Sequence, residues 1–186
     1  MKTIARAISV LLHPAILQCI FLLYPYPNGN LGAYELSVVL FLSALFPLLA
    51  SALYFYYTGI TDYYTIPANK RYIPFLLSLS GLIMAWVFMQ GTHSEISTRL
   101  ILIISFNITA GIITPFEKIS LHTFALTLIC VLWFGAFGIL PFLLLIPVIW
   151  ARLYLKSHNP KQIILGFGMG IALGLLFLSE WLPIYS

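Results

Sequence analysis

The sequence predicts an all-α integral membrane protein: a polytopic transmembrane helix bundle with six to seven spans, forming a single domain over residues 1–186. Composition is the first observation, because 61% of the residues are hydrophobic and only 8% are charged, whereas a soluble domain carries about 25% charged residues. The second is the pattern, since long apolar runs alternate with short polar loops. No polar segment is long enough to fold as a separate soluble domain.

The apolar runs give the expected spans, because a transmembrane helix needs about 20 mostly apolar residues. The first run follows Lys2 and Arg6 and has no small-residue cleavage site, so we expect a span and not a cleaved signal peptide. The turn at 135–138 is itself apolar, which leaves the count open by one. In order, the runs are Ile4–Tyr24, Tyr34–Thr58, Ile73–Gln90, Thr98–Phe116, Leu121 to about Phe137, Ile139–Leu155 and Gln162–Leu182.

The loops between these runs carry the charges unevenly. With seven spans, eight of the nine Lys and Arg residues fall on the side of the N-terminus, and only Arg99 falls on the other. The positive-inside rule assigns such a basic side to the cytoplasm. That inference weakens if several of these cations bind phosphate, since they would then be present for another reason. The eight are Lys2, Arg6, Lys70, Arg71, Lys118, Arg152, Lys156 and Lys161.

Three polar clusters fall on this basic side, at residues 69–74, 117–122 and 152–162. Basic side chains bind phosphate oxygens, and arginine does so through two parallel hydrogen bonds. A histidine near its ordinary pKa serves as a nucleophile or as a general acid at neutral pH. The clusters contain two histidines, His122 and His158, and therefore permit both roles.

The third cluster has the clearest local structure. Asn159 followed by Pro160 is a good helix start, with Asn159 as the N-cap and Pro160 at the first helical position. Arg152 and His158 should therefore lie at the shared end of two helices. The open N–H groups and positive dipole of the second helix suit an anion there, above all a phosphate.

Two of the polar residues have a plain structural interpretation beside the functional one. Gln162 lies three residues after Asn159, which is the spacing of a capping box. It also lies four residues after His158, so its amide oxygen is placed to accept from the imidazole, and both interactions are compatible. Ser120 is either a phosphate ligand or simply the N-cap of the helix that follows it.

The three clusters, taken together, resemble the signature of the type 2 phosphatidic acid phosphatase superfamily. That signature consists of Lys-x6-Arg-Pro, Pro-Ser-Gly-His and Ser-Arg-x5-His-x3-Asp segments, in this order, at membrane helix ends. Arg152 and His158 match the third segment, and Ser120 with His122 matches the second. Arg71 matches the first only loosely. The resemblance covers over half of the chain, and implies a phosphatase-like core over about 69–182.

The resemblance implies a mechanism and a substrate class. His158 would attack phosphorus and form a phosphohistidine, and His122 would protonate the leaving alkoxide. The substrate would be a lipid phosphate in a membrane, in this case the bacterial inner (cytoplasmic) membrane, with no metal or other cofactor and no nucleic acid. The residues that would hold the phosphate are Arg152, Arg71 and Ser120, with Lys70 or Lys118 in place of the family's lysine.

The sequence departs from the family pattern at several positions. Gln162 replaces the aspartate that orients the nucleophilic histidine, and Tyr64 stands where the lysine is expected. An amide accepts a hydrogen bond and fixes a tautomer, but it does not stabilise an imidazolium by charge. We therefore expect a slow or variant enzyme or an inactive relative. The alternative is a non-catalytic anionic-lipid binding or transport protein with the same basic site, and a membrane scaffold is a weaker third possibility.

Two further features lie outside the signature. His13 precedes Pro14 inside the first run, and an intramembrane ionisable residue is a functional candidate by default. A histidine at a proline kink near the interface is an equally good interpretation, so His13 is left out of the expected site. Glycines at 166, 170 and 174 repeat every four residues, which favours close helix packing inside the chain over a dimer contact.

Overall fold

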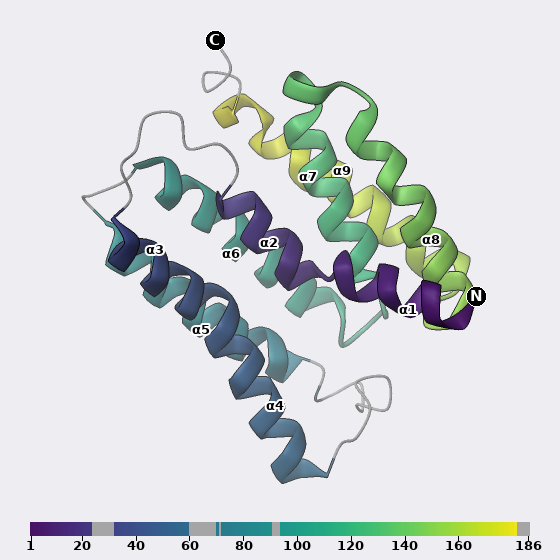
Figure 1. Ribbon diagram of the computed structural model, residues 1–186, viewed down its shortest axis with the longest axis horizontal. Helices are drawn as coiled ribbons and strands as arrows, with labels where there is room; N and C mark the ends of the chain where they lie inside the picture. The colour runs from purple at the N-terminus through teal and green to yellow at the C-terminus, as the bar shows by residue number, and fades with distance from the viewer. Residues whose placement is uncertain (24–31, 60–69, 71, 91–93, 182–186) are drawn as a thin grey trace. The chain divides into compact units, whose positions relative to one another are not determined.

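The computed structural model describes residues 1–23, 32–59, 70, 72–90 and 94–181 (Figure 1). All regular structure in these ranges is helical, which confirms the predicted all-α class. A π-helical segment, Phe41–Leu45, joins α3 to α4, and a 3-10 helix, Leu140–Leu144, precedes α8. The helices are α1 Lys2–Leu11, α2 Pro14–Leu23, α3 Ala33–Leu40, α4 Phe46–Thr58, α5 Tyr72–Met89, α6 Ser94–Ile113, α7 Leu121–Phe137, α8 Leu145–Tyr154 and α9 Pro160–Trp181.

Four helices in the described ranges are long and apolar enough to cross a membrane. The number of candidate spans rises to five if the bent pair α1 and α2 is counted as one span. The helices at Leu121–Phe134 and Leu140–Tyr154 are apolar but shorter. The chain thus has the make-up of a membrane protein, although six to seven spans exceed the number that length and composition alone support. The four spans are Ala33–Thr58, Tyr72–Met89, Ile96–Ile113 and Pro160–Leu178.

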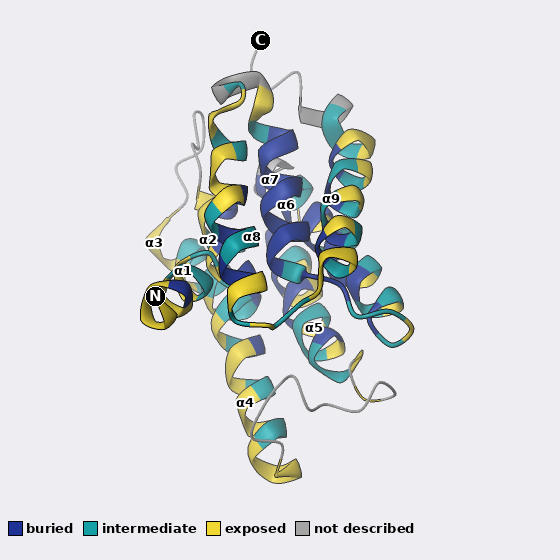
Figure 2. Ribbon diagram, turned by 90° about the vertical axis from the view of Figure 1, so that its right-hand side faces the viewer, coloured by how far each residue is buried: buried dark blue, intermediate teal, exposed yellow. Residues whose placement is uncertain are grey.

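The chain forms two compact units. The first unit combines Met1–Leu17 with Glu117–Ser186, and the second is Gln18–Phe116. Within the first unit, α7, α8 and α9 lie side by side and α1 packs against α8 (Figure 1). Helix α7 is the core of this unit, since nearly all its described residues are buried, whereas α8 and α9 keep an exposed face (Figure 2).

Helix α9 packs closely on α7 because its facing residues have no side chain. A Cβ at Gly166 would lie 2.6 Å from the carbonyl oxygen of Ser120, and one at Gly170 would lie 2.6 Å from Thr127 Cβ. A Cβ at Gly174 would meet Val131 Cγ1 at 2.7 Å. The prediction that this glycine face packs inside the chain is confirmed.

The first apolar run is broken at Pro14, the proline that the sequence offered as a kink site. Helix α1 ends at Leu11 and α2 begins at Pro14, with a bend of 41° between them. Proline has no N–H for the helix ladder and its ring clashes with the carbonyl four residues earlier. The His13 N–H accordingly bonds to the Val10 carbonyl, one residue nearer than in an α-helix, at 3.1 Å.

In the second unit, a proline also explains the π-helical segment. Pro47 cannot donate to the carbonyl of Ser43, four residues before it, so the backbone rearranges over Phe41–Leu45. Helix α5 lies against this turn through Gly81, where a Cβ would collide with the Leu42 carbonyl oxygen. The π-helical segment therefore lies where the α3–α4 helix and α5 approach each other closely.

The second unit also accounts for Arg99, the cation that the sequence placed apart from the others. Arg99 is only 2% exposed and lies on α6. Its Nη1 donates to the carbonyl oxygens of Phe21 and Leu22 at 3.2 and 3.3 Å, and its guanidinium stands 6.0 Å from the Phe21 ring centroid. These carbonyls belong to the last turn of α2, where a cation is favourable.

Candidate functional site

Five of the predicted site residues come together in the first unit, around the N-terminal ends of α7 and α9. Ser120 is the N-cap of α7, and His122 lies in its first turn. Arg152 lies in the last turn of α8. His158 follows in the loop after α8, and Gln162 lies in the first turn of α9.

The ends of α7 and α9 are joined by two direct contacts. The backbone N–H of Ser120 donates to the carbonyl oxygen of Gln162 at 3.1 Å. At the surface, Lys161 Nζ pairs with Glu117 Oε2 at 2.8 Å. Because Gly166 lets the two helices approach at this level, the cluster at 117–122 and the cluster at 152–162 form one structure.

Arg152 is the centre of positive charge in this structure. It is 5% exposed, and its Nη1 donates to the hydroxyl oxygen of Ser9 at 3.4 Å. Its charge acts on the rings of His13, His122 and His158. A buried guanidinium attracts an anion strongly, because little water screens its charge.

Gln162 makes both of the interactions that the sequence allowed. Its Oε1 accepts from the Asn159 backbone N–H at 3.2 Å, and Asn159 Oδ1 accepts from the Gln162 N–H at 3.0 Å, which completes the capping box. The same Oε1 lies 3.1 Å from His158 Nδ1. Since a backbone N–H points at this atom, it must be the oxygen, so His158 Nδ1 carries the proton and donates. Nε2 of the neutral ring is left with its lone pair.

The environment keeps the His158 ring neutral. The pKa of His158 is lowered from 6.5 to about 4, chiefly by burial and then by the charges of Arg152 and Lys118, while the Gln162 hydrogen bond acts in the opposite direction. At neutral pH the ring therefore has an unprotonated Nε2. That is the state a nucleophile requires.

His122 is held by the N-terminal helix. Its Nε2 lies 3.0 Å from the carbonyl oxygen of Ser9, and because a carbonyl only accepts, Nε2 carries the proton. His122 is 8% exposed, and it lies near enough to His158 for the two rings to affect each other electrostatically. Nδ1 is therefore the nitrogen available for proton transfer.

Ser120 caps its helix, as the plainer interpretation predicted. Its Oγ accepts from the Thr123 backbone N–H at 3.4 Å and lies 2.9 Å from the Thr123 hydroxyl. The residue is 0% exposed. Its role as a phosphate ligand stays a prediction.

The remaining phosphate-binding candidates differ in their placement. Lys118 lies near enough to His158 for its charge to act on the ring. Lys70 is exposed and belongs to the second unit. Arg71 falls outside the described residues.

Comparison with known proteins adds no relative. No family model, curated protein or solved structure matches the chain. The site must therefore be interpreted from its own geometry. Within the described ranges, no group of three or more His, Cys, Asp or Glu residues is arranged to hold a metal ion.

Sequence reasoning missed the contribution of residues 9–13. Ser9 contacts both Arg152 and His122, and the ring of His13 stands edge-on to His122 with centroids 5.4 Å apart. The available signal was an ionisable residue directly before a proline inside an apolar run. Nothing in the sequence pattern indicated that this run packs against the two distant clusters.

Proposed function

We propose that the protein is an integral membrane lipid phosphatase or phosphotransferase that acts on a lipid (di)phosphate through a phosphohistidine intermediate. The observation that carries the proposal is the arrangement of His158. Its Nδ1–H is held by Gln162, its Nε2 is unprotonated, and the buried Arg152 and the second histidine, His122, interact with it electrostatically. The likeness of the clusters to the type 2 phosphatidic acid phosphatase signature supports the same assignment.

In the first step, His158 Nε2 attacks the phosphorus of the lipid phosphate. A P–N bond forms and the P–O bond to the lipid breaks, with the charge on the phosphoryl oxygens balanced by Arg152 and Lys118. The lipid alkoxide leaves with a proton from Nδ1 of His122. This step requires the ring to be protonated at both nitrogens, and the negative charge of the bound phosphate stabilises that form against the effects of burial and Arg152.

In the second step, water replaces the lipid. The water oxygen attacks phosphorus, the P–N bond breaks, and inorganic phosphate leaves while His122 Nδ1 takes the proton from the water. For a lipid monophosphate the sum is hydrolysis of the ester to an alcohol and phosphate. For a lipid diphosphate attacked at its terminal phosphorus, the lipid monophosphate leaves in place of the alkoxide, and the sum is hydrolysis of the anhydride to a lipid monophosphate and phosphate. A second alcohol in place of water gives phosphotransfer by the same route.

The membrane setting is part of the proposal. The chain crosses the bacterial inner membrane six to seven times. Two of the spans are short: one is α7, and the other is the 3-10 helix and α8 together, at Leu140–Tyr154. The apolar helices admit the lipid chain laterally, and the cations hold its phosphate. The active site faces the outer side, as the family resemblance implies, although the basic loops alone favour the cytoplasmic side.

The test is phosphate release by the purified protein in lipid nanodiscs. The substrates are phosphatidate, phosphatidylglycerophosphate, undecaprenyl pyrophosphate and a lipid A phosphate, and the control is His158→Ala. We expect release from at least one substrate, its loss in the variant, and a phosphohistidine at residue 158 detected by mass spectrometry after an alkaline quench. Release that persists in His158→Ala excludes the mechanism.

A non-catalytic lipid binding or transport protein is the second candidate, favoured by the amide at Gln162. The amide orients His158 but supplies no charge to stabilise the imidazolium that develops during attack. Tight binding of the same lipid phosphates with no release and no phosphohistidine identifies this function instead.

A further inference from the structure

We propose that His13 is a third histidine of the phosphate site and a fixed hydrogen-bond donor to the bound anion. This inference rests on the proposed function only in that the site binds a lipid phosphate. It holds equally for an enzyme and for a binding protein. The observations behind it are the position of the ring, the state of its two nitrogens and the break in the first helix.

The break between α1 and α2 places His13 beside the site. Pro14 interrupts the helix ladder, and α1, which ends just before it, packs against α8. Ser9 then reaches Arg152 and His122, and the His13 ring stands perpendicular to that of His122 at 5.4 Å. The charge of Arg152 acts on both rings.

The nitrogens of His13 have different roles. Its Nδ1 accepts from the backbone N–H of Ala15 at 3.2 Å. An imidazole nitrogen that accepts cannot carry the proton in the neutral ring, so the proton is on Nε2. His13 therefore offers a hydrogen-bond donor whether the ring is neutral or charged.

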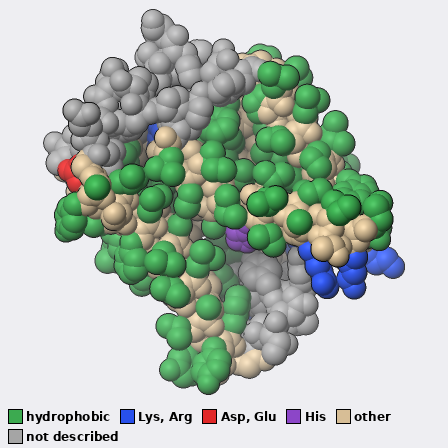
Figure 3. Space-filling view, viewed as in Figure 1, with side chains coloured by type: hydrophobic (Ala, Val, Ile, Leu, Met, Phe, Trp, Pro, Cys, Tyr) green, Lys and Arg blue, Asp and Glu red, His purple; other side chains and the backbone are tan. Residues whose placement is uncertain are grey.

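His13 also differs from His122 in its accessibility. His122 is buried, whereas His13 is exposed, and histidine surface is visible near the junction of α1 and α2 (Figure 3). The exposed cations Lys2 and Arg6 lie on α1, at whose N-terminal end Lys and Arg side chains gather in the same view. An anion that approaches from this face thus meets His13 before the buried Arg152.

The competing explanation is that His13 only caps α2. Its Nδ1 contact with Ala15 satisfies one of the open N–H groups at the start of that helix, which is the usual task of an N-cap. Asparagine is a good N-cap but has no group in the position of Nε2–H. His13→Asn therefore keeps the cap and removes the donor, whereas His13→Ala removes both.

The experiment measures the binding of a non-hydrolysable phosphonate analogue of phosphatidate to the full chain in detergent micelles. The variants are His13→Asn and His13→Ala, with Arg6→Asn as a control on an exposed cation of the same helix. We expect both His13 variants to bind about tenfold more weakly, as for loss of one hydrogen bond to a charged group. Only His13→Ala should also melt at a lower temperature. Arg6→Asn should bind within about twofold of the wild type.

The outcomes separate this inference from the proposed function. His13→Asn binding that equals wild-type binding overturns the inference, whatever the wild type does to lipid phosphates. Phosphate release that is absent in the wild type, with tenfold weaker binding in His13→Asn, supports the inference and removes the enzyme. A wild-type protein that does not bind the phosphonate overturns this inference, whereas the proposed function is decided by the phosphate-release test with the four lipid phosphates.

Discussion

At the scale of single residues, one oxygen of Gln162 has two tasks. It closes the capping box at the start of α9, and it fixes the tautomer of His158. A glutamate has the same length as glutamine and is itself favoured at this capping-box position. It therefore preserves both contacts, whereas the shorter aspartate of the family motif has to reach the ring from a residue one methylene smaller.

The first prediction follows from this geometry. Gln162→Glu should increase any turnover about ten- to a hundredfold, the size of effect that a carboxylate partner has on a metal-bound histidine, because the carboxylate stabilises the charge that develops on the ring. It should also raise the pKa of His158 above about 4, because the carboxylate favours the protonated ring. The acidic limb of kcat/KM against pH should move upward accordingly. An unchanged rate and profile would show that Gln162 serves only the helix.

The lowered pKa of His158 has a consequence for stability. Between the unfolded value of 6.5 and the folded value of about 4, the unfolded chain binds more protons at this residue. Stability therefore decreases as the pH falls through that window. We expect the melting temperature of the wild type to drop between pH 7 and pH 4.5 by more than that of His158→Gln. Parallel curves for the two proteins would contradict the lowered pKa.

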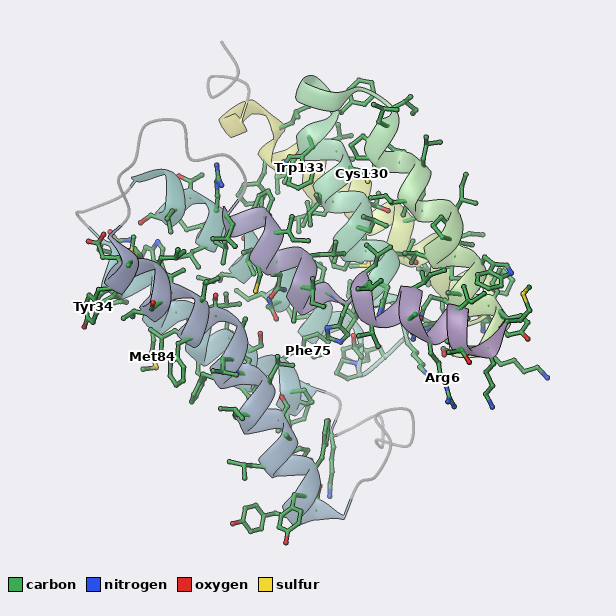
Figure 4. The ribbon with its side chains drawn as sticks, viewed as in Figure 1. Arg6, Tyr34, Phe75, Met84, Cys130 and Trp133 are labelled. Carbon is green, nitrogen blue, oxygen red and sulfur yellow. The ribbon has the colours of Figure 1, made fainter. Side chains whose placement is uncertain are left out.

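Arg152 offers a test of planar recognition. Arg152→Lys keeps the charge but loses the contact with Ser9 and the planar fork by which a guanidinium holds two phosphate oxygens at once. We expect lipid phosphate binding at least tenfold weaker. The matched control is Arg6→Lys, because the Arg6 side chain is exposed and points away from the helices in Figure 4. Equal losses in the two variants would mean that Arg152 is only a general source of charge.

At the scale of helices, local patterns were reliable and long-range ones were not. The start of α9 at Asn159 and Pro160 and the glycine face of α9 are local features, and the structure has both. The sequence offers a proline kink at Pro14 as one interpretation, which the structure confirms, but it gives no sign of the π-helical segment before Pro47. Hydropathy stays high across a proline, so a hydropathy pattern shows neither the missing N–H nor the change in helix geometry that follows from it.

The glycine face gives a sharp test of α7–α9 packing. A Cβ at Gly170 would meet Thr127 Cβ at 2.6 Å and the Phe124 carbonyl oxygen at 2.8 Å, whereas one at Gly168 meets nothing within 4 Å. Gly170→Ala should lower the free energy of unfolding by about 1–3 kcal/mol through overpacking. Gly168→Ala should raise it by up to about 1 kcal/mol through helix propensity. Denaturant unfolding measures both, and equal effects would contradict the packing.

At the scale of the whole molecule, the sequence predicted the clusters at 117–122 and 152–162 but not what completes them. Ser9 and His122 are 113 positions apart in the chain, and no periodicity connects them. The sequence could not predict the burial of α7 either, because an apolar helix inside a protein has the same hydropathy as one that faces lipid. Helix α7 is largely buried within its own unit, although its sequence reads as a span.

The number of spans depends on α7 and α8. With 17 residues, α7 is about 25 Å long at 1.5 Å per residue, short of a hydrocarbon core of about 30 Å. A short helix still spans the membrane when the bilayer thins locally. Helix α7 and the helix at Leu140–Tyr154 then form a hairpin, and the seven-span interpretation places its tip, the turn at residues 138–139, on the side opposite the site. Ile139 at the tip is 64% exposed, and Lys156, in the loop after α8, is exposed as well.

Cysteine labelling in intact cells tests this arrangement. Ile139→Cys and Lys156→Cys are each introduced into a chain in which Cys19 and Cys130 have been replaced by alanine, and a membrane-impermeant maleimide is added from outside and then after lysis. We expect one of the two to react from outside and the other only after lysis, because a spanning hairpin separates them by the bilayer. An Ile139→Cys that stays unreactive in both conditions would mean that α7 and α8 form a re-entrant hairpin. The tip would then lie in the hydrocarbon, and the chain would cross the membrane two times fewer.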